Sequence, residues 1–374
     1  MDIGFDNQVF GLQSRGGISR YFAELGGAMQ SLGERVYCAA GLHFNDYLRT
    51  PGFHVAGVHV GRYPRALANK VRFLNTRHSD FYLRRRKVQV LHETYYRPAR
   101  QAVGHIPVVV TVHDLIHEIF PEEFSPNDPT ALHRRLSVDR ADHVICVSAG
   151  TQRDLVERLA IPIEKTSVIY HGITRFSPAA PPIEGPKPLA AGAPYLLHVG
   201  NRRGYKNFDN LLRAYASSAR LRATVRLVAF GGGPPTPAEL DLLRRSALSS
   251  GDDLAGVSFV RGDDARLSSH LLGAMALVYP SRYEGFGMPP LEAMAAGCPV
   301  ICSRASVMPE VLGSAPHYFE PGDVDDIRRA LEEVVFSSTL RASLVSAGHD
   351  RAGRYSWRRC AEESLAVYRG LLRR

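Results

Sequence analysis

Short apolar runs alternate along the chain with stretches in which apolar residues recur every three or four positions. The runs are typical of buried strands, and the periodic stretches are typical of amphipathic helices. Their alternation predicts βα units and mostly parallel sheets. The predicted strands are residues 2–5, 36–40, 88–92, 108–112, 144–147, 167–170, 195–199, 226–229, 257–260, 276–279 and 300–302, and the clearest helices are residues 18–32, 151–159, 207–217, 238–249 and 324–336.

A proline-rich segment separates two series of such units. Residues 177–194 contain six prolines among 18 residues, too many for a helix or a central strand. We therefore predict one α/β domain over residues 1–176, a linker over 177–194 and a second α/β domain over 195–356. Residues 357–374 predict a last amphipathic helix that needs a surface to cover.

The composition, 45% hydrophobic and 22% charged residues, is that of a globular protein. No apolar run approaches the roughly 18 residues that span a bilayer. The N-terminus has acids where a signal peptide needs basic residues, which argues against secretion. Five cysteines without a Cys-x-x-Cys motif suit a reducing cytoplasm.

The net charge of +9 is concentrated in one segment. Residues 62–87 hold nine basic residues and one acid, interleaved with apolar and aromatic residues. This favours a local basic surface, which suits an anionic membrane or a polyprenyl diphosphate lying in it, over a nucleic-acid-binding protein. The alternative is a solvated helix face whose apolar side is core. The candidate patch is Arg72, Arg77, Arg84, Arg85, Arg86 and Lys87.

Four segments at the ends of predicted strands carry unusual residues, where doubly wound sheets bind ligands. Gly16 and Gly17 open a long helix, whose first amides can receive an anion, or they form a plain flexible loop. His113 precedes Asp114 at the end of an apolar strand. It can orient or exchange a proton, although a histidine bonded to a backbone carbonyl is the simpler interpretation.

The other two segments are richer in charge. Arg202, Arg203 and Lys206 follow a strand together with two glycines, Gly200 and Gly204, which suits a diphosphate, although an exposed basic loop is the alternative. Glu284 and Glu292 lie eight residues apart, one in a glycine-rich loop and one in the first turn of the next helix. Two carboxylates there can accept hydrogen bonds from sugar hydroxyls, and a cap alone explains Glu292 but not Glu284. The loop and helix start offer the amides of Gly285, Phe286, Gly287, Met288 and Leu291.

The block EGFGMPPLEAMAAGCPVICS, with the later Met308-Pro309-Glu310-Val311, closely resembles the retaining GT-B glycosyltransferases of family 4 (GT4), the "group 1" type. The resemblance covers most of the chain, through GGISRYFAEL, TVHDL, ADHVICVS, VIYHGI and HVGNRRGYKN. The opening and the TVHDL strand end are most similar to bacterial mannosyltransferases that build O-antigen or exopolysaccharide. His171 stands where the family commonly has Asn, and the run Gly231-Gly232-Gly233 is longer than the usual Gly-x-Gly.

The resemblance implies a GT-B fold, with two facing Rossmann-like domains, a cleft between them and a C-terminal helix that packs back toward the N-terminal domain. It implies that Glu284, with the amides of Phe286 and Gly287, holds the donor sugar, and that Glu292 holds the ribose. Arg202 or Arg203, with Lys206, would bind the diphosphate, which Gly16 and Gly17 would face. His113 would lie near the sugar and the acceptor, and Val260, Arg261 and Gly262 would border the base.

The expected function is transfer of a hexose with retention, mannose from GDP-mannose being favoured, to a glycan or polyprenyl-diphosphate-linked acceptor of surface polysaccharide or lipopolysaccharide. We expect a cytoplasmic enzyme, peripheral on the inner face of the plasma membrane. Fixed cations and a helix N-terminus can stabilise the leaving diphosphate, so we expect no metal or other cofactor. Asp323 and Asp263 precede helices and are predicted to be caps. The alternatives are a nucleotide-sugar epimerase or hydrolase of the same fold, and a non-catalytic nucleotide-binding protein.

Overall fold

The computed structural model describes residues 1–61, 63–174, 193–245 and 256–373. The chain forms two compact units. The N-terminal unit is Met1–Gly172 together with Tyr355–Arg374, and the C-terminal unit is Ile173–Arg354. The predicted linker, 177–194, lies outside the described residues as far as residue 192. No helix in the described ranges is both long and apolar enough to cross a membrane.

The N-terminal unit is built on a seven-stranded parallel sheet of order β3-β2-β1-β4-β5-β6-β7. The chain runs outward from β1 through β2 to β3 and then returns to the other side of β1 with β4. The carboxyl ends of β1 and β4 therefore flank the point where the strand order reverses. The strands are β1 (Asp2–Phe5), β2 (Arg35–His43), β3 (His54–His59), β4 (Val90–Glu93), β5 (Val108–Val112), β6 (His143–Cys146) and β7 (Thr166–Val168).

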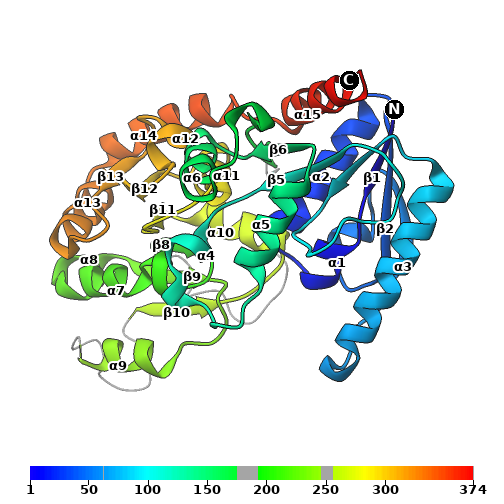
Figure 1. Cartoon of the computed structure of the whole chain (residues 1–374). Coiled ribbons are helices and arrows are strands. Elements are labelled where there is room, and N and C mark those ends of the chain that lie inside the picture. Colours follow the sequence, from blue (N-terminus) through cyan, green and yellow to red (C-terminus); the bar gives the residue numbers. More distant parts are fainter. Residues whose placement is uncertain (62, 175–192, 246–255, 374) are drawn as a thin grey trace. The chain divides into compact units, whose positions relative to one another are not determined.

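Helices cover both faces of this sheet. One face buries α2 (Gly17–Ser31) and α15 (Trp357–Leu372), which lie side by side (Figure 1). The other face packs against α3 (Ala68–Arg86) through Leu83. The C-terminal helix thus packs on the N-terminal unit, as expected. The remaining helices are α1 (Gln8–Leu12), α4 (Ile116–Ile119), α5 (Thr130–Arg140) and α6 (Ala149–Leu159).

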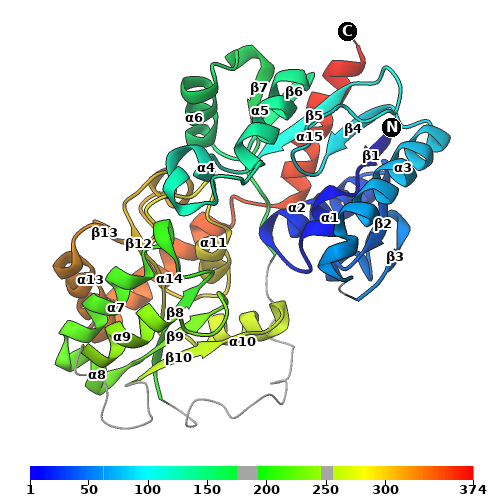
Figure 2. The same cartoon turned by 60° about the horizontal axis from the view of Figure 1, so that its bottom comes forward.

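The C-terminal unit repeats the plan with a six-stranded parallel sheet of order β10-β9-β8-β11-β12-β13 (Figure 2). Its order reverses between β8 and β11. The strands are β8 (Tyr195–Val199), β9 (Arg226–Phe230), β10 (Val257–Val260), β11 (Ala276–Tyr279), β12 (Val300–Ser303) and β13 (His317–Phe319). The helices are α7 (Phe208–Ser217), α8 (Ala219–Thr224), α9 (Pro237–Arg245), α10 (Asp264–Gly273), α11 (Met288–Ala295), α12 (Met308–Leu312), α13 (Val324–Phe336) and α14 (Ser338–Ala352).

The predicted fold class is confirmed, since both units are doubly wound α/β sheets. Every predicted strand is present to within three residues at its ends. The edge strands β3 and β13 were not predicted. β3 is half-exposed along its length and mixes histidine and glycine with valine, so it lacks the apolar run of a central strand. The predicted caps are confirmed, because Asp323 accepts the amides of Asp325 and Asp326, and Asp263 accepts that of Arg266.

Candidate functional site

Two predicted site segments follow the two central strands of the C-terminal sheet. The loop after β8 carries Arg202, Arg203 and Lys206, and the loop after β11 carries Glu284. β8 and β11 are neighbours at the reversal of strand order, so both loops leave the same edge of the sheet at its switch point. Ligands of doubly wound sheets bind at such a point.

Lys206 and Glu284 join these loops directly. Lys206 Nζ donates to Glu284 Oε1 at 2.6 Å, and both side chains are largely buried. The ammonium also lies 3.4 Å from the Tyr279 hydroxyl and close to the faces of Tyr205 and Tyr279. An ammonium has three donors. Among the described residues Glu284 and Tyr279 take two of them, which leaves one donor for an anion.

The two loops are further held together through their backbones. The amide of Arg282 donates to the carbonyl of Tyr205 at 2.7 Å. Asn207, in a left-handed conformation at φ 58°, donates from Nδ2 to the carbonyls of Pro280 and Pro321. These contacts place Lys206 opposite Glu284 without depending on either charge. Sequence reasoning missed Asn207 and Tyr279, although the asparagine before a helix was a visible signal.

The loop that carries Glu284 leads into α11, which begins Met288-Pro289-Pro290. Prolines suit this first turn because its amides have no intrahelical acceptor. Gly287 is left-handed at φ 98°, a conformation that few other residues adopt. Glu284, Phe286, Leu291 and Glu292 are all buried. Glu292 is the fifth residue of α11 and does not lie in the first turn as predicted, so the motif places one carboxylate in the loop before the helix and one in its second turn.

Arg202 has a different environment from Arg203. Its guanidinium is buried and bonded to Glu239 at 2.7 Å, and also to the carbonyls of Gly231, Gly233 and Pro234. Burial raises the pKa of Glu239, but the hydrogen bonds from Arg202 and Thr236 outweigh it, so the pKa is lowered. Arg203 is exposed.

The long glycine run now has a physical explanation. Gly231, Gly232 and Gly233 all have positive φ, and a Cβ on Gly232 would lie 2.7 Å from Arg202 Nη1. The run curves around the buried guanidinium, which the sequence could not show. Of the residues predicted to border the base, Val260 ends β10 and accepts the amide of Gly231, while Arg261 and Gly262 are exposed.

In the N-terminal unit, His113 directly follows β5. Its ring lies edge-on to Tyr21, with centroids 5.1 Å apart, and 5.5 Å from the ring of His171. Burial lowers the pKa of His113 to about 4, and its Nε2 is a buried atom with no hydrogen-bond partner among the described residues. The imidazole is therefore neutral at pH 7.

Gly16 and Gly17 open α2 as predicted. The side chain of Gln13 folds over this end, where its Oε1 accepts the amide of Ser19. A Cβ on Gly16 would lie 2.3 Å from that oxygen, so the glycine makes room for Gln13. The helix start is thus partly capped from within the chain.

The basic patch lies on α3 and just beyond it, and all six of its residues are exposed. Phe73, Leu74 and Phe81 are each about 60% exposed on the same helix. The alternative, in which the apolar side is core, holds for Leu83 and Val71 but not for these three.

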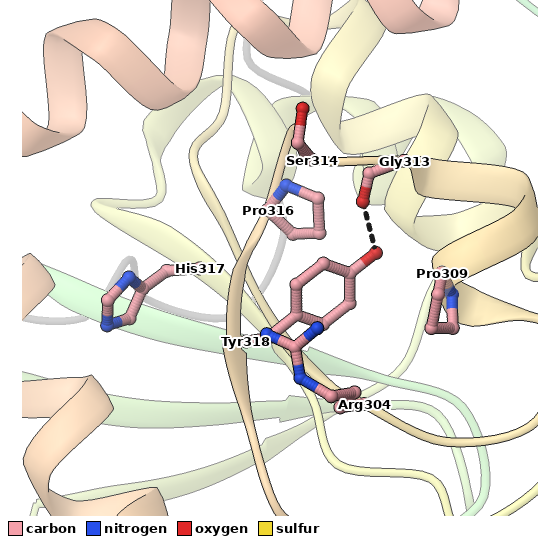
Figure 3. A pocket seen from close by; sticks show the side chains of 7 residues that line it. All are labelled: Arg304, Pro309, Gly313, Ser314, Pro316, His317 and Tyr318. Carbon is pink, nitrogen blue, oxygen red and sulfur yellow. Dashed lines mark hydrogen bonds between the residues drawn. The ribbon is translucent and has the colours of Figure 1, made fainter.

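A depression of about 430 Å³ lies between α12 and the edge strand β13 (Figure 3). Arg304 stacks over the ring of Tyr318, whose hydroxyl donates to the carbonyl of Gly313 at 2.7 Å. None of its lining residues was predicted to belong to the site. In the described residues, no three His, Cys, Asp or Glu side chains come together as a metal site would require.

Comparison with known proteins gives matches over both units. Residues 15–175 match the family model Glycosyltransferase Family 4, and residues 182–351 match Glycosyl transferases group 1. The chain is 28% identical over 318 residues to O-antigen chain mannosyltransferase B of Escherichia coli, covering 81% of this chain and 80% of that protein. It is 26% identical over 276 residues to the serotype-specific mannosyltransferase WbdA of E. coli, covering 71% of this chain and only 33% of WbdA.

Solved structures resemble the fold as a whole. The Anabaena Alr3699/HepE structure in complex with UDP and glucose has a TM-score of 0.70 at 17% identity, covering 98% of both chains.

Proposed function

The chain belongs to the glycosyltransferases, with a Family 4 domain followed by a group 1 domain, and we propose that it transfers mannose from GDP-mannose to a surface-polysaccharide acceptor. The observation that carries this proposal is the joining of the β8 and β11 loops by Lys206 and Glu284 at the switch point of the C-terminal sheet. The names of the relatives, both mannosyltransferases, support the choice of sugar.

The chemistry follows from the charges available. The oxygen of an acceptor hydroxyl bonds to the anomeric carbon while the bond from that carbon to the diphosphate oxygen breaks. The nucleoside diphosphate leaves with the bonding electrons and takes up the hydroxyl proton. Lys206, the exposed Arg203 and the first amides of α11 would stabilise that anion without a metal or other cofactor. Arg202 would instead support the loop around it.

The remaining assignments concern the sugar, the base and the acceptor. Glu284 would accept hydrogen bonds from sugar hydroxyls, and Glu292 from the ribose. Residues 260–262 would border the base. His113, neutral at pH 7, would orient the acceptor rather than remove its proton. We also propose that the reaction retains the configuration of the anomeric carbon.

We further propose that the acceptor is linked to polyprenyl diphosphate and that α3 docks on the anionic inner face of the plasma membrane. Exposed basic and aromatic side chains on one helix support this, since cations attract anionic headgroups and aromatic rings enter the interface.

The test of the function is a donor panel of GDP-mannose, UDP-glucose, UDP-GlcNAc and dTDP-rhamnose, scored by thermal shift and by nucleotide release with and without a mannan oligosaccharide. Stabilisation by GDP-mannose and GDP release that depends on the acceptor are expected. Equal release without acceptor would favour an epimerase or hydrolase, and no preference for GDP-mannose would overturn the choice of donor.

A further inference from the structure

Ser306 lies in a segment of the C-terminal unit that the glycosyltransferase motifs leave without a role. Residues 304–308 follow β12 and lead into α12, and we call them the support segment. The Ser306 hydroxyl donates to the backbone carbonyl of Glu284 at 2.8 Å. It therefore holds the main chain of the residue whose carboxylate Lys206 holds at 2.6 Å.

The backbone of Ser306 is left-handed, at φ 50°. Such a conformation is unfavourable for any residue with a Cβ, and glycine adopts it freely. Strained residues of this kind persist where the surrounding structure fixes them, often at functional sites. Serine supplies a hydroxyl that bonds the carbonyl of Glu284, and glycine would not.

The support segment also contacts the other end of the same loop. A Cβ on Gly287 would lie 2.6 Å from Met308 Cε, so the methionine packs directly on that glycine. Met308 is in turn fixed by Tyr318, whose hydroxyl lies 3.1 Å from its carbonyl and also donates to Gly313 (Figure 3). Both ends of the loop from Glu284 to Gly287 thus rest on one segment.

We propose that Ser306 is a positioning residue for sugar transfer, which fixes the main chain of Glu284 so that its carboxylate meets the donor sugar. The inference rests on the proposed role of Glu284. Small misplacements of a positioned group cost far more in turnover than in folding, because the reacting geometry is narrow. The diphosphate contacts proposed for Lys206 and Arg203 come from the loop after β8, whereas the Ser306 hydroxyl bonds the loop after β11.

The test uses the full chain with Ser306→Gly, Ser306→Thr and the control Ala160→Gly. Ala160 has the same φ of 50° at the end of α6 but no hydroxyl, so its variant reports relief of backbone strain alone. We measure Tm, amide hydrogen exchange over residues 283–288, GDP affinity, and GDP release from GDP-mannose. Ser306→Gly is expected to keep its Tm within about 2 °C, since strain relief offsets the lost hydrogen bond.

Ser306→Gly should exchange the amides of residues 283–288 roughly ten-fold faster and lower kcat roughly ten-fold, with GDP affinity unchanged. Ser306→Thr should lower Tm but preserve kcat, because a β-branched residue is strained at positive φ yet keeps the hydroxyl. Its Tm falls and its turnover stays near the parental value. Ala160→Gly should leave both exchange and turnover as in the parent.

Unchanged exchange and unchanged kcat in Ser306→Gly would overturn the proposal, whatever happens to Tm. Glu284→Gln, assayed in parallel, separates the two levels of inference. If Glu284→Gln has the parental kcat, the proposed role of Glu284 is wrong. Amide exchange over residues 283–288 then tests by itself whether Ser306 fixes the loop. If the parent releases no GDP from GDP-mannose in the presence of the mannan oligosaccharide, the donor or the acceptor is wrong, and amide exchange over residues 283–288 decides for Ser306.

Discussion

The ammonium of Lys206 lies 2.6 Å from a carboxylate oxygen of Glu284, which joins the loops after the two central strands of one sheet. The side chains are only 12% and 11% exposed, so each charge offsets the burial of the other. Under the proposed function, this ion pair would lie between the diphosphate and the donor sugar.

Breaking this pair from one side leaves the other group buried without its partner, so the losses of the two single variants should not be additive. Lys206→Met and Glu284→Gln each leave a largely buried polar partner, and each is expected to lose about 3 kcal/mol of unfolding free energy. The double variant should lose less than the sum, which a double-mutant cycle in urea measures. Additive losses would show that the two groups are energetically independent.

The same residues should control turnover. Glu284→Ala and Lys206→Ala are each expected to lower kcat at least ~10²-fold, the size of effect seen when a charge-stabilising group is lost. Lys165→Ala, a lysine of the N-terminal unit bonded to the carbonyl of Asp139, is the control and should keep parental turnover. A near-parental rate in either site variant would remove that residue from the site.

Arg202 and Arg203 should separate stability from donor binding. Arg202→Ala leaves Glu239 buried without its positively charged partner and is expected to cost about 3–5 kcal/mol of unfolding free energy. Arg203→Ala should change stability by less than about 0.5 kcal/mol, because the residue is exposed. It should instead weaken GDP binding, measured by calorimetry. If Arg202→Ala weakened GDP binding and Arg203→Ala lowered stability, the roles of the two arginines would be exchanged.

Arg202 and Arg203 also show which features of the site can be predicted from the sequence and which cannot. Most strand positions and the glutamate motif follow from local pattern and resemblance, and the predicted strands lie within three residues of their expected ends, whereas β3 and β13 were not predicted. Which arginine is buried depends on Glu239 and the Gly231–Gly233 turn, which come from another βα unit. Ser306 depends on a bond to Glu284 that spans 22 residues and on a backbone angle that no local pattern indicates.

His92 should make the N-terminal unit lose stability in mild acid. Its ring is fully buried, with Nδ1 2.6 Å from the Tyr368 hydroxyl of α15 and Nε2 2.8 Å from Thr111. Burial, aided by His113, lowers its pKa from 6.5 to about 3. Below pH 6.5 His92 is protonated in the unfolded chain but stays neutral in the folded chain. The stability that is present above pH 6.5 is therefore lost as the pH falls.

From pH 7.5 to 5.5 this one group should cost the parent about 1.4 kcal/mol of unfolding free energy. His92→Gln removes the titration, so urea unfolding at the two pH values should show a smaller loss in the variant by about that amount. The difference between the two proteins reports His92 together with its effect on the neighbouring His113. If the unfolding free energies of the parent and of His92→Gln fell equally between the two pH values, His92 would not be a neutral buried imidazole.

Turnover is expected to survive removal of divalent metals. Lys206, Arg203 and the start of α11 supply positive charge where the diphosphate would leave. GDP release from GDP-mannose should therefore be the same in 5 mM EDTA as in 5 mM MgCl₂, within about two-fold. A strict requirement for Mg²⁺ or Mn²⁺, restored by adding the ion back, would refute the metal-free mechanism.

The exposed face of α3 should bind anionic vesicles. We expect co-sedimentation with phosphatidylethanolamine–phosphatidylglycerol vesicles but not with phosphatidylcholine. Each basic residue near an anionic surface contributes about 1 kcal/mol, so glutamine at positions 84–87 should weaken binding at least about a hundred-fold. Glutamine at Arg245, Arg329, Arg358 and Arg359, all exposed, removes the same charge elsewhere and should have little effect.

Phe73→Ser with Phe81→Ser should weaken vesicle binding by an amount that does not depend on salt, because aromatic rings and not charges are lost. Binding that ignores lipid charge, or that survives neutralisation of 84–87, would show that this patch is only a solvated helix face.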